Sequence, residues 1–244
     1  MTDFEAHVGC GMECHVVVQL PDIQFRCTYP PIMRLVRDLS DAQRDHIGSC
    51  GFGYLLQMTD IHVNHGLLTV LVEQFHSEHN TFHLSTGEMT ITLEDVYNIM
   101  RIPFVGDKVD YDATPRQGIE ALRRIFQDGT ILNRDITWDD LLSRYGAQFP
   151  LACVLASIIG CFVMSDRGQQ GFLCGWGRML ERLLIHPVRL GWGSGLLVNI
   201  YHEMHGITYR GAKSMATSVL VLYIWVWEHI LVCRPIVDDS RQDG

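Results

Sequence analysis

Lysine is nearly absent from this sequence, and no run of basic residues occurs anywhere in it. The 244 residues include two lysines, Lys108 and Lys213, and the net charge at neutral pH is -9. Proteins that bind nucleic acid without sequence preference usually carry a concentrated basic patch. The composition therefore argues against nonspecific phosphate binding, although an arginine-lined groove on an acidic protein stays open as the alternative.

Long hydrophobic runs are also missing. The two most apolar stretches, residues 150–164 and 215–227, are each shorter than the roughly 17–25 residues that a membrane-spanning helix needs. Serine and glycine interrupt the first stretch, and threonine and serine interrupt the second. Because 47% of all residues are hydrophobic and 19% are charged, we expect these stretches to be helices in a large buried core.

The cysteines follow no regular spacing. Eight of them are scattered along the chain, and the first residues carry no basic segment of the kind that opens a secretory signal. Free cysteines in apolar sequence behave as small hydrophobic residues. We therefore expect a reducing compartment, either the cytosol or the nucleus.

Histidine is frequent, so metal sites must be considered. His202 and His205 are three residues apart, whereas the helical zinc motif of metalloproteases places its histidines four apart. Cys10 and Cys14, with a histidine on either side, form one zinc knuckle where a structural site usually has two. The histidines between residues 62 and 83 are expected to decorate helix ends and a hairpin. We expect no bound metal.

A β-hairpin is the clearest local feature. Residues 81–84 favour a strand, and residues 89–93 alternate apolar and polar side chains at the two-residue period of a strand. Residues 85–88 are expected to form the turn, in which Gly87 is free to adopt a positive φ.

Helix starts are marked by side chains that can cap a helix. The clearest are capping boxes, in which a serine or threonine is followed three residues later by a side chain that reaches back; they fall at Ser40–Gln43, Thr92–Asp95 and Thr114–Gln117. Further helices are predicted to begin at Asn64, Thr137, Pro150, Ser194 and Ser214. The helices from Ser194 and Ser214 should end at Gly206 and near Val232, and the glycine-rich segment 168–177 is expected to be a loop. Strands do not alternate with helices, so the predicted fold is mainly α: a single helical globular domain with a small antiparallel hairpin.

Several short motifs resemble the plant mobile domain family, also called the aminotransferase-like plant mobile domain, in the order in which that family has them. They are Gly51–Leu56, Glu78–Leu84, Gly191–Ser194, Arg210–Lys213, Trp225–Glu228 and Arg234–Pro235. Ser85 and Thr86 depart from the family, which usually has proline and valine there. The resemblance covers about residues 48–235. We expect a plant mobile domain at residues 39–235, a divergent N-terminal arm at 1–38 and a flexible tail at 236–244.

The resemblance assigns structural roles to the motif residues and implies no catalytic, cofactor-binding or metal-binding residue. These motif residues are Phe82, His83, Gly87, Glu88, Trp192, Gly193, Arg210, Gly211, Lys213, Trp225, Trp227 and Glu228. A pyridoxal phosphate enzyme would need a Schiff-base lysine in a scaffold that holds the phosphate. Lys213 stands before a predicted helix start, without a parallel α/β sheet, so we expect no cofactor and no enzymatic activity.

The function implied by the resemblance is protein–protein interaction. Members of this family are transposon-derived or transposon-related nuclear proteins linked to transposon silencing, genome stability and meristem maintenance. The expected partners are other plant mobile domain proteins or a phosphatase-like protein, with no membrane association and no direct nucleic-acid binding. The alternative is a nucleic-acid-binding module of a mobile element.

Overall fold

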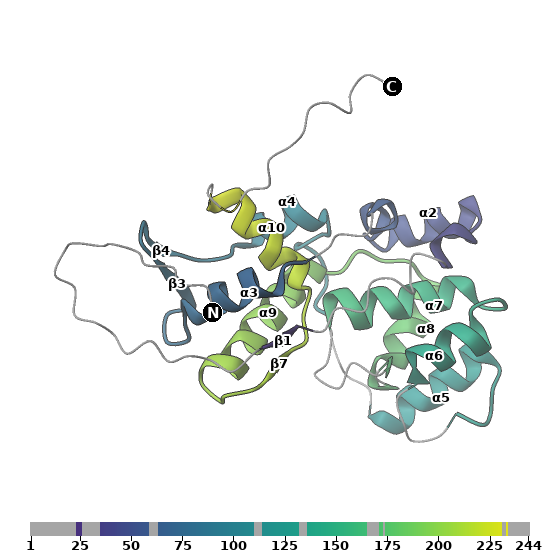
Figure 1. Cartoon of the computed structure of the whole chain (residues 1–244). Helices are drawn as coiled ribbons and strands as arrows, with labels where there is room; N and C mark the ends of the chain where they lie inside the picture. The colour runs from purple at the N-terminus through teal and green to yellow at the C-terminus, as the bar shows by residue number, and fades with distance from the viewer. Residues whose placement is uncertain are drawn as a thin grey trace.

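The computed structural model describes residues 23–25, 35–58, 63–109, 114–131, 136–164, 171–172, 174–230 and 233. The fold is mainly α, as predicted, and its helices lie in two groups (Figure 1). One group, called here the helical half, contains α2 and α5 to α8. The other, called the hairpin half, contains α3, α4, α9, α10 and the small sheets β2–β4 and β1–β7.

Most of the predicted helix starts are confirmed. Ser40, Thr92 and Thr114 each make both hydrogen bonds of a capping box, and Asn64 and Thr137 each accept one N–H from the first turn that follows them. The helices are α2 (Asp41–Ser49), α3 (His65–Glu73), α4 (Leu93–Met100), α5 (Pro115–Phe126), α6 (Trp138–Asp140), α7 (Pro150–Ser157), α8 (Gly177–Ile185), α9 (Trp192–Thr208) and α10 (Val219–His229). A π-helical turn, Leu141–Tyr145, extends α6, and a second one, Ile158–Val163, extends α7. Within the described residues, no helix is long and apolar enough to cross a membrane.

The strands are short and form three small sheets. β2 (Phe75–His76), β3 (Thr81–Leu84) and β4 (Gly87–Met89) make an antiparallel sheet in that order; β1 (Gln24–Phe25) pairs in parallel with β7 (Ser214–Met215), and β5 (Ile136–Thr137) pairs antiparallel with β6 (Gly171–Phe172). Phe82 pairs with Phe75 on one side and with Met89 on the other. This register directs the Phe82 side chain into the core, where it is fully buried.

The hairpin is confirmed, but its turn is shorter than predicted. Leu84 pairs directly with Gly87, so the turn contains only Ser85 and Thr86, and Gly87 has a φ of 124°. The second strand ends at Met89 because the segment that follows is held by other contacts. The Tyr201 hydroxyl donates to the Ile91 carbonyl at 2.6 Å, an interaction between α9 and the hairpin that local alternation cannot predict.

The predicted helix from Ser214 is wrong at its start. Ser214 and Met215 form strand β7, and α10 begins only at Val219. The cause is tertiary: the Glu203 carboxylate accepts the N–H of Ala216 at 2.9 Å, and β1 supplies a partner strand from the other end of the chain. α9 likewise begins at Trp192 rather than Ser194 and continues past Gly206 to Thr208.

Glycines near residue 177 belong to a helix contact rather than a long loop. α8 begins at Gly177, and a 3₁₀ turn, Cys174–Trp176, precedes it. A Cβ at Gly118 would collide with the Cys174 carbonyl, and a Cβ at Gly177 would collide with the Gly118 carbonyl. The glycines therefore let the α5 and α8 backbones touch. Elsewhere in the predicted loop, residues 171–172 form β6, and residues 168–170 and 173 lie outside the described residues.

The motif aromatics form the centre of the core. Trp192, Trp225, Phe52 and Phe82 are among the largest fully buried side chains. The Phe82 ring centroid lies 5.1 Å from that of Trp225, and the Phe52 centroid lies 5.0 Å from that of Trp192. Both ring pairs are tilted, at 34° and 42°, and aromatic contacts add stability beyond the area they bury.

Candidate interaction groove

The motif Gly191–Ser194 fastens the loop after α4 onto the first turn of α9. The N–H of Gly193 donates to the Pro103 carbonyl at 2.8 Å, and the Ser194 hydroxyl donates to the Phe104 carbonyl at 3.0 Å. A Cβ at Gly193 would lie 3.1 Å from the Phe104 Cβ, closer than most real contacts. Glycine therefore lets the loop approach the helix without displacing Phe104.

The same loop continues along the backbone that leads into α9. Asp107 forms an isolated parallel bridge with Leu190, and the Gly191 N–H donates to the Asp107 carbonyl at 2.9 Å. Gly106 has a φ of 153°, and a Cβ there would lie 2.7 Å from the Arg189 carbonyl oxygen. Residues 103–107 are thus held at several points by backbone hydrogen bonds.

Trp192 anchors this region to the core. Its indole Nε1–H donates to the Cys50 carbonyl at 3.1 Å, which satisfies the polar end of a fully buried ring. Burial raises the pKa of the Cys50 thiol to about 11. The thiol is therefore protonated at neutral pH and is a poor nucleophile.

An open groove of about 540 Å³ lies between the anchored loop and α9. Its apolar lining comes from Phe104, Val109, Met164 and Val198, and its polar lining includes Asp107, Lys108, Ser194, Asn199 and His202. Val198 is 68% exposed, and Val105, next to the lining residue Phe104, is 75% exposed. Branched aliphatic side chains at this exposure leave apolar area in contact with water.

An aromatic shoulder extends the groove toward α4. Tyr97 is 41% exposed, and its ring meets Phe104 edge-on with centroids 5.7 Å apart. The Arg101 guanidinium lies 5.6 Å from the Tyr97 ring centroid, within cation–π range. Tyrosine and arginine are the residue types that dominate binding energy at protein interfaces.

The sequence profile of the plant mobile domain matches residues 51–243. The chain belongs to the plant mobile domain family. It is similar to several proteins of Arabidopsis thaliana. Identity to Protein MAIN-LIKE 1 is 24%, over 81% of this chain and 42% of that protein. Identity to Protein MAINTENANCE OF MERISTEMS is also 24%, over 78% of this chain and 42% of that protein. Identity is 26% to a serine/threonine-protein phosphatase 7 long form homolog, over 72% of this chain and 14% of that protein.

The chain therefore spans less than half the length of these curated relatives. No solved structure matches this plant mobile domain significantly.

The motif residues of the plant mobile domain do not converge on one site. Phe82 and Trp225 meet in the core, and Trp192 and Gly193 support the groove. His83 and Glu88 lie on the hairpin, with Nε2 and Oε1 3.2 Å apart. The remaining motif residues lie elsewhere: Arg210, Gly211 and Lys213 follow α9, and Trp227 and Glu228 are near the end of α10. This dispersion is typical of residues that build a fold.

The histidine motif of α9 is also dispersed. His202 lines the groove, and His205 Nε2 lies 2.7 Å from the Asn80 side-chain oxygen. Glu203 is buried at 3% exposure, where it accepts the Ala216 N–H. Within the part of the chain that the structure describes, no three histidine, cysteine, aspartate or glutamate side chains are placed to hold a metal. Cys10 and Cys14 lie outside that part.

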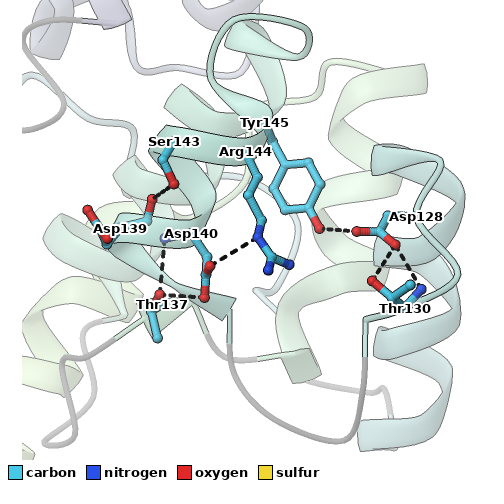
Figure 2. A network of polar contacts seen from close by, with 8 residues as sticks. All are labelled: Asp128, Thr130, Thr137, Asp139, Asp140, Ser143, Arg144 and Tyr145. Atoms are coloured by element: carbon cyan, nitrogen blue, oxygen red, sulfur yellow. Dashed lines mark hydrogen bonds and ion pairs between the residues drawn. The ribbon is translucent and has the colours of Figure 1, made fainter.

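A polar network in the helical half was not foreseen from the sequence. Figure 2 shows Asp128 accepting hydrogen bonds from Thr130 and, at 2.6 Å, from the Tyr145 hydroxyl. Nearby, Arg144 Nε lies 3.2 Å from Asp140 Oδ1 in an ion pair, and the Thr137 hydroxyl donates a hydrogen bond to the Asp140 carboxylate and accepts one from the Asp140 N–H. The network joins the turn after α5 to the segment that starts at Thr137.

The ionisation of this network does not suit acid–base catalysis. Hydrogen bonds from Thr130, then from Tyr145, lower the pKa of Asp128 to about 2. Burial, followed by the bond to Asp128, raises the pKa of Tyr145 to about 12. A general acid or base works best with a pKa near the operating pH. This arrangement is better explained as a structural tie between two segments.

Lys213 occupies an exposed position at the edge of β7. Its backbone carbonyl accepts the Gln24 N–H at 3.0 Å, and its side chain projects from the protein surface. The role that the structure shows for this residue is therefore to join β1 to β7.

Proposed function

We propose that this plant mobile domain is a non-catalytic protein-interaction domain, and that its groove receives an apolar segment of a partner protein. The observation that carries the proposal is the exposure of Val105 and Val198 at 75% and 68% beside a preformed groove. Exposed apolar area next to a hollow of this size is typical of a surface that another molecule covers.

The rigidity of the groove supports the same proposal. Gly193 and Ser194 fix the loop after α4 through hydrogen bonds of 2.8 and 3.0 Å. The wall of the groove that this loop forms is therefore preformed. A preformed site loses little conformational entropy when it binds. The exposed Tyr97 and Arg101 beside it provide the side chains that most often act as binding hot spots.

Catalysis receives no comparable support from the described residues. The carboxylate of Asp128 and the phenol of Tyr145 titrate far from neutrality, with pKa values of about 2 and about 12. Burial also raises the pKa of the Cys153 thiol, to about 12, which makes it a weak nucleophile. We therefore propose that the domain acts by binding.

The cellular setting is proposed from the relatives. Two are named for meristem maintenance or as similar to such a protein, and a third is named as a phosphatase homolog. We propose a nuclear role in transposon silencing, genome stability or meristem maintenance. The proposed partners are other plant mobile domain proteins and a phosphatase-like protein.

The test compares two valine substitutions on exposed helix faces. Val198→Gln changes the groove, whereas Val70→Gln changes α3, where the valine is 56% exposed. Binding would be measured by calorimetry with purified MAINTENANCE OF MERISTEMS, MAIN-LIKE 1 and the phosphatase 7 long form homolog. We expect Val198→Gln to weaken binding to at least one of them about tenfold and Val70→Gln to leave it within about twofold.

Glutamine is a good helix former, so both variants should keep their thermal stability. Equal affinities for wild type and Val198→Gln would contradict the groove as the binding site. Binding of DNA by the wild type, with a steep loss of affinity as salt rises, would favour a nucleic-acid module instead.

A further inference from the structure

The turn that follows α9 is held rigidly at both ends. Gly211 adopts a φ of 64°, and its N–H donates to the Ile207 carbonyl at 3.1 Å, while the Ala212 N–H donates to the Gly206 carbonyl at 2.9 Å. The Gly211 bond closes the helix in the manner of an αL C-cap motif, and the Ala212 bond fixes the residue that follows. Immediately afterwards, the Lys213 carbonyl accepts a hydrogen bond from the Gln24 N–H, and β7 pairs with β1. The backbone of residues 209–213 is therefore preorganised.

Three side chains project from this turn. Tyr209 is 81% exposed, more than any other large hydrophobic side chain in the described part of the chain. Arg210 and Lys213 are also exposed, and neither forms an ion pair with a described residue. A rigid turn thus presents one aromatic ring and two cations to solvent.

The charge around this turn makes the two cations distinctive. Residues 63–109 and 191–230 contain eight carboxylates and four lysines or arginines, namely Arg101, Lys108, Arg210 and Lys213. Arg101 already contacts the Tyr97 ring. Half of the cations of this acidic part therefore lie within one turn of five residues, at the end of α9 remote from the groove.

We propose that the turn Tyr209–Lys213 binds an acidic segment of a partner protein. An arginine matches a carboxylate through two parallel hydrogen bonds, and a lysine adds a second positive charge. The tyrosine ring adds apolar contact at low entropic cost because its backbone is already fixed. This surface is separate from the groove and does not depend on it.

A protein segment fits this surface better than nucleic acid does. Two cations would neutralise about two phosphates, which gives a salt slope near -1.8, compared with the six to ten phosphate contacts of strong binders. A short acidic segment needs only the two charges that the turn provides.

A different explanation is that the cations only complement the dipole at the C-terminus of α9. That role would change thermal stability slightly and would leave binding unaffected. The two explanations therefore differ in a measurable quantity, which is the affinity for an acidic peptide.

The experiment measures fluorescence anisotropy of labelled deca-glutamate with the full chain, at low and at physiological ionic strength. Arg210→Glu is compared with Arg37→Glu, which makes the same charge change at an exposed position just before α2. We expect Arg210→Glu to weaken binding about tenfold or more, and Arg37→Glu to weaken it by less than about twofold. Tyr209→Ala should also weaken it.

Absence of deca-glutamate binding by the wild type, or equal losses in the two arginine variants, would overturn the proposal. Tighter binding of a short DNA duplex, also lost with Arg210→Glu, would assign the turn to nucleic acid instead. Val198→Gln should leave the affinity for deca-glutamate unchanged, so the failure of this proposal and the failure of the groove can be told apart.

Discussion

Truncation of Trp225 should show whether α10 is the structural centre of the domain. The Trp225 side chain is fully buried, and its ring centroid lies 5.1 Å from that of Phe82 and 4.8 Å from that of His229. Replacement of a buried aromatic by alanine typically costs about 3–5 kcal/mol. For a chain of this length, a change of that size lowers the melting temperature by about 6–20 °C.

The Trp225 indole N–H refines this estimate. Nε1 is buried without a hydrogen-bond partner among the described residues, and such a group opposes folding by about 1–3 kcal/mol. Trp225→Ala removes this penalty together with the ring, so the loss should lie at the lower end of the range. Trp225→Phe keeps much of the apolar volume and removes the N–H, so it should cost about 1–2 kcal/mol.

Trp227 supplies the matched control on the same helix. Trp227 is partly exposed, and its ring centroid lies 4.4 Å from that of Tyr223. Trp227→Ala should therefore lower the free energy of unfolding by about 1 kcal/mol. Unfolding in guanidinium chloride would be followed by far-UV circular dichroism, because tryptophan fluorescence changes with the substitutions themselves. If the midpoint of Trp225→Ala moves no further than that of Trp227→Ala, the burial argument is refuted.

Three further predictions concern single residues. Gly118→Ala should destabilise the domain by about 3 kcal/mol, because the new Cβ collides with the Cys174 carbonyl. The control is Gly48→Ala in α2, where nothing lies within 4 Å of the new Cβ, and this change should raise the melting temperature slightly. Asp128→Asn should lower the free energy of unfolding at neutral pH. Because the pKa of Asp128 is lowered in the folded protein, this stability is lost as the carboxylate is protonated, so the difference in unfolding free energy between wild type and variant should shrink as pH falls from about 4 to about 2. A difference that stays constant across that pH range would contradict the prediction. Glu203→Ala should cost about 1–3 kcal/mol in urea denaturation because it leaves a buried N–H unpaired, and an unchanged midpoint would show that this bond is unimportant.

Residues close in the sequence determined the parts of this protein that could be predicted. Ser40, Thr92 and Thr114 cap helices through side chains only three residues away, so their effect does not depend on the rest of the fold. The hairpin is equally local, because Gly87 can adopt the positive φ that a tight turn requires. The excess of such helix starts over strands was sufficient to predict a mainly α domain.

Tertiary contacts decided the features that the sequence pattern missed. Ser214 reads as a helix cap, but β1 pairs with this segment across about 190 residues and delays α10 to Val219. Gly177 reads as a loop residue, but together with Gly118 of α5 it allows α5 and α8 to touch. The groove arises where the loop after α4 meets α9. The hydrogen bond from Ser194 to Phe104 joins residues that are 90 positions apart in the sequence. Periodicity describes which side of an element is apolar, whereas only the packed chain decides which distant element covers it and which apolar side chains stay exposed.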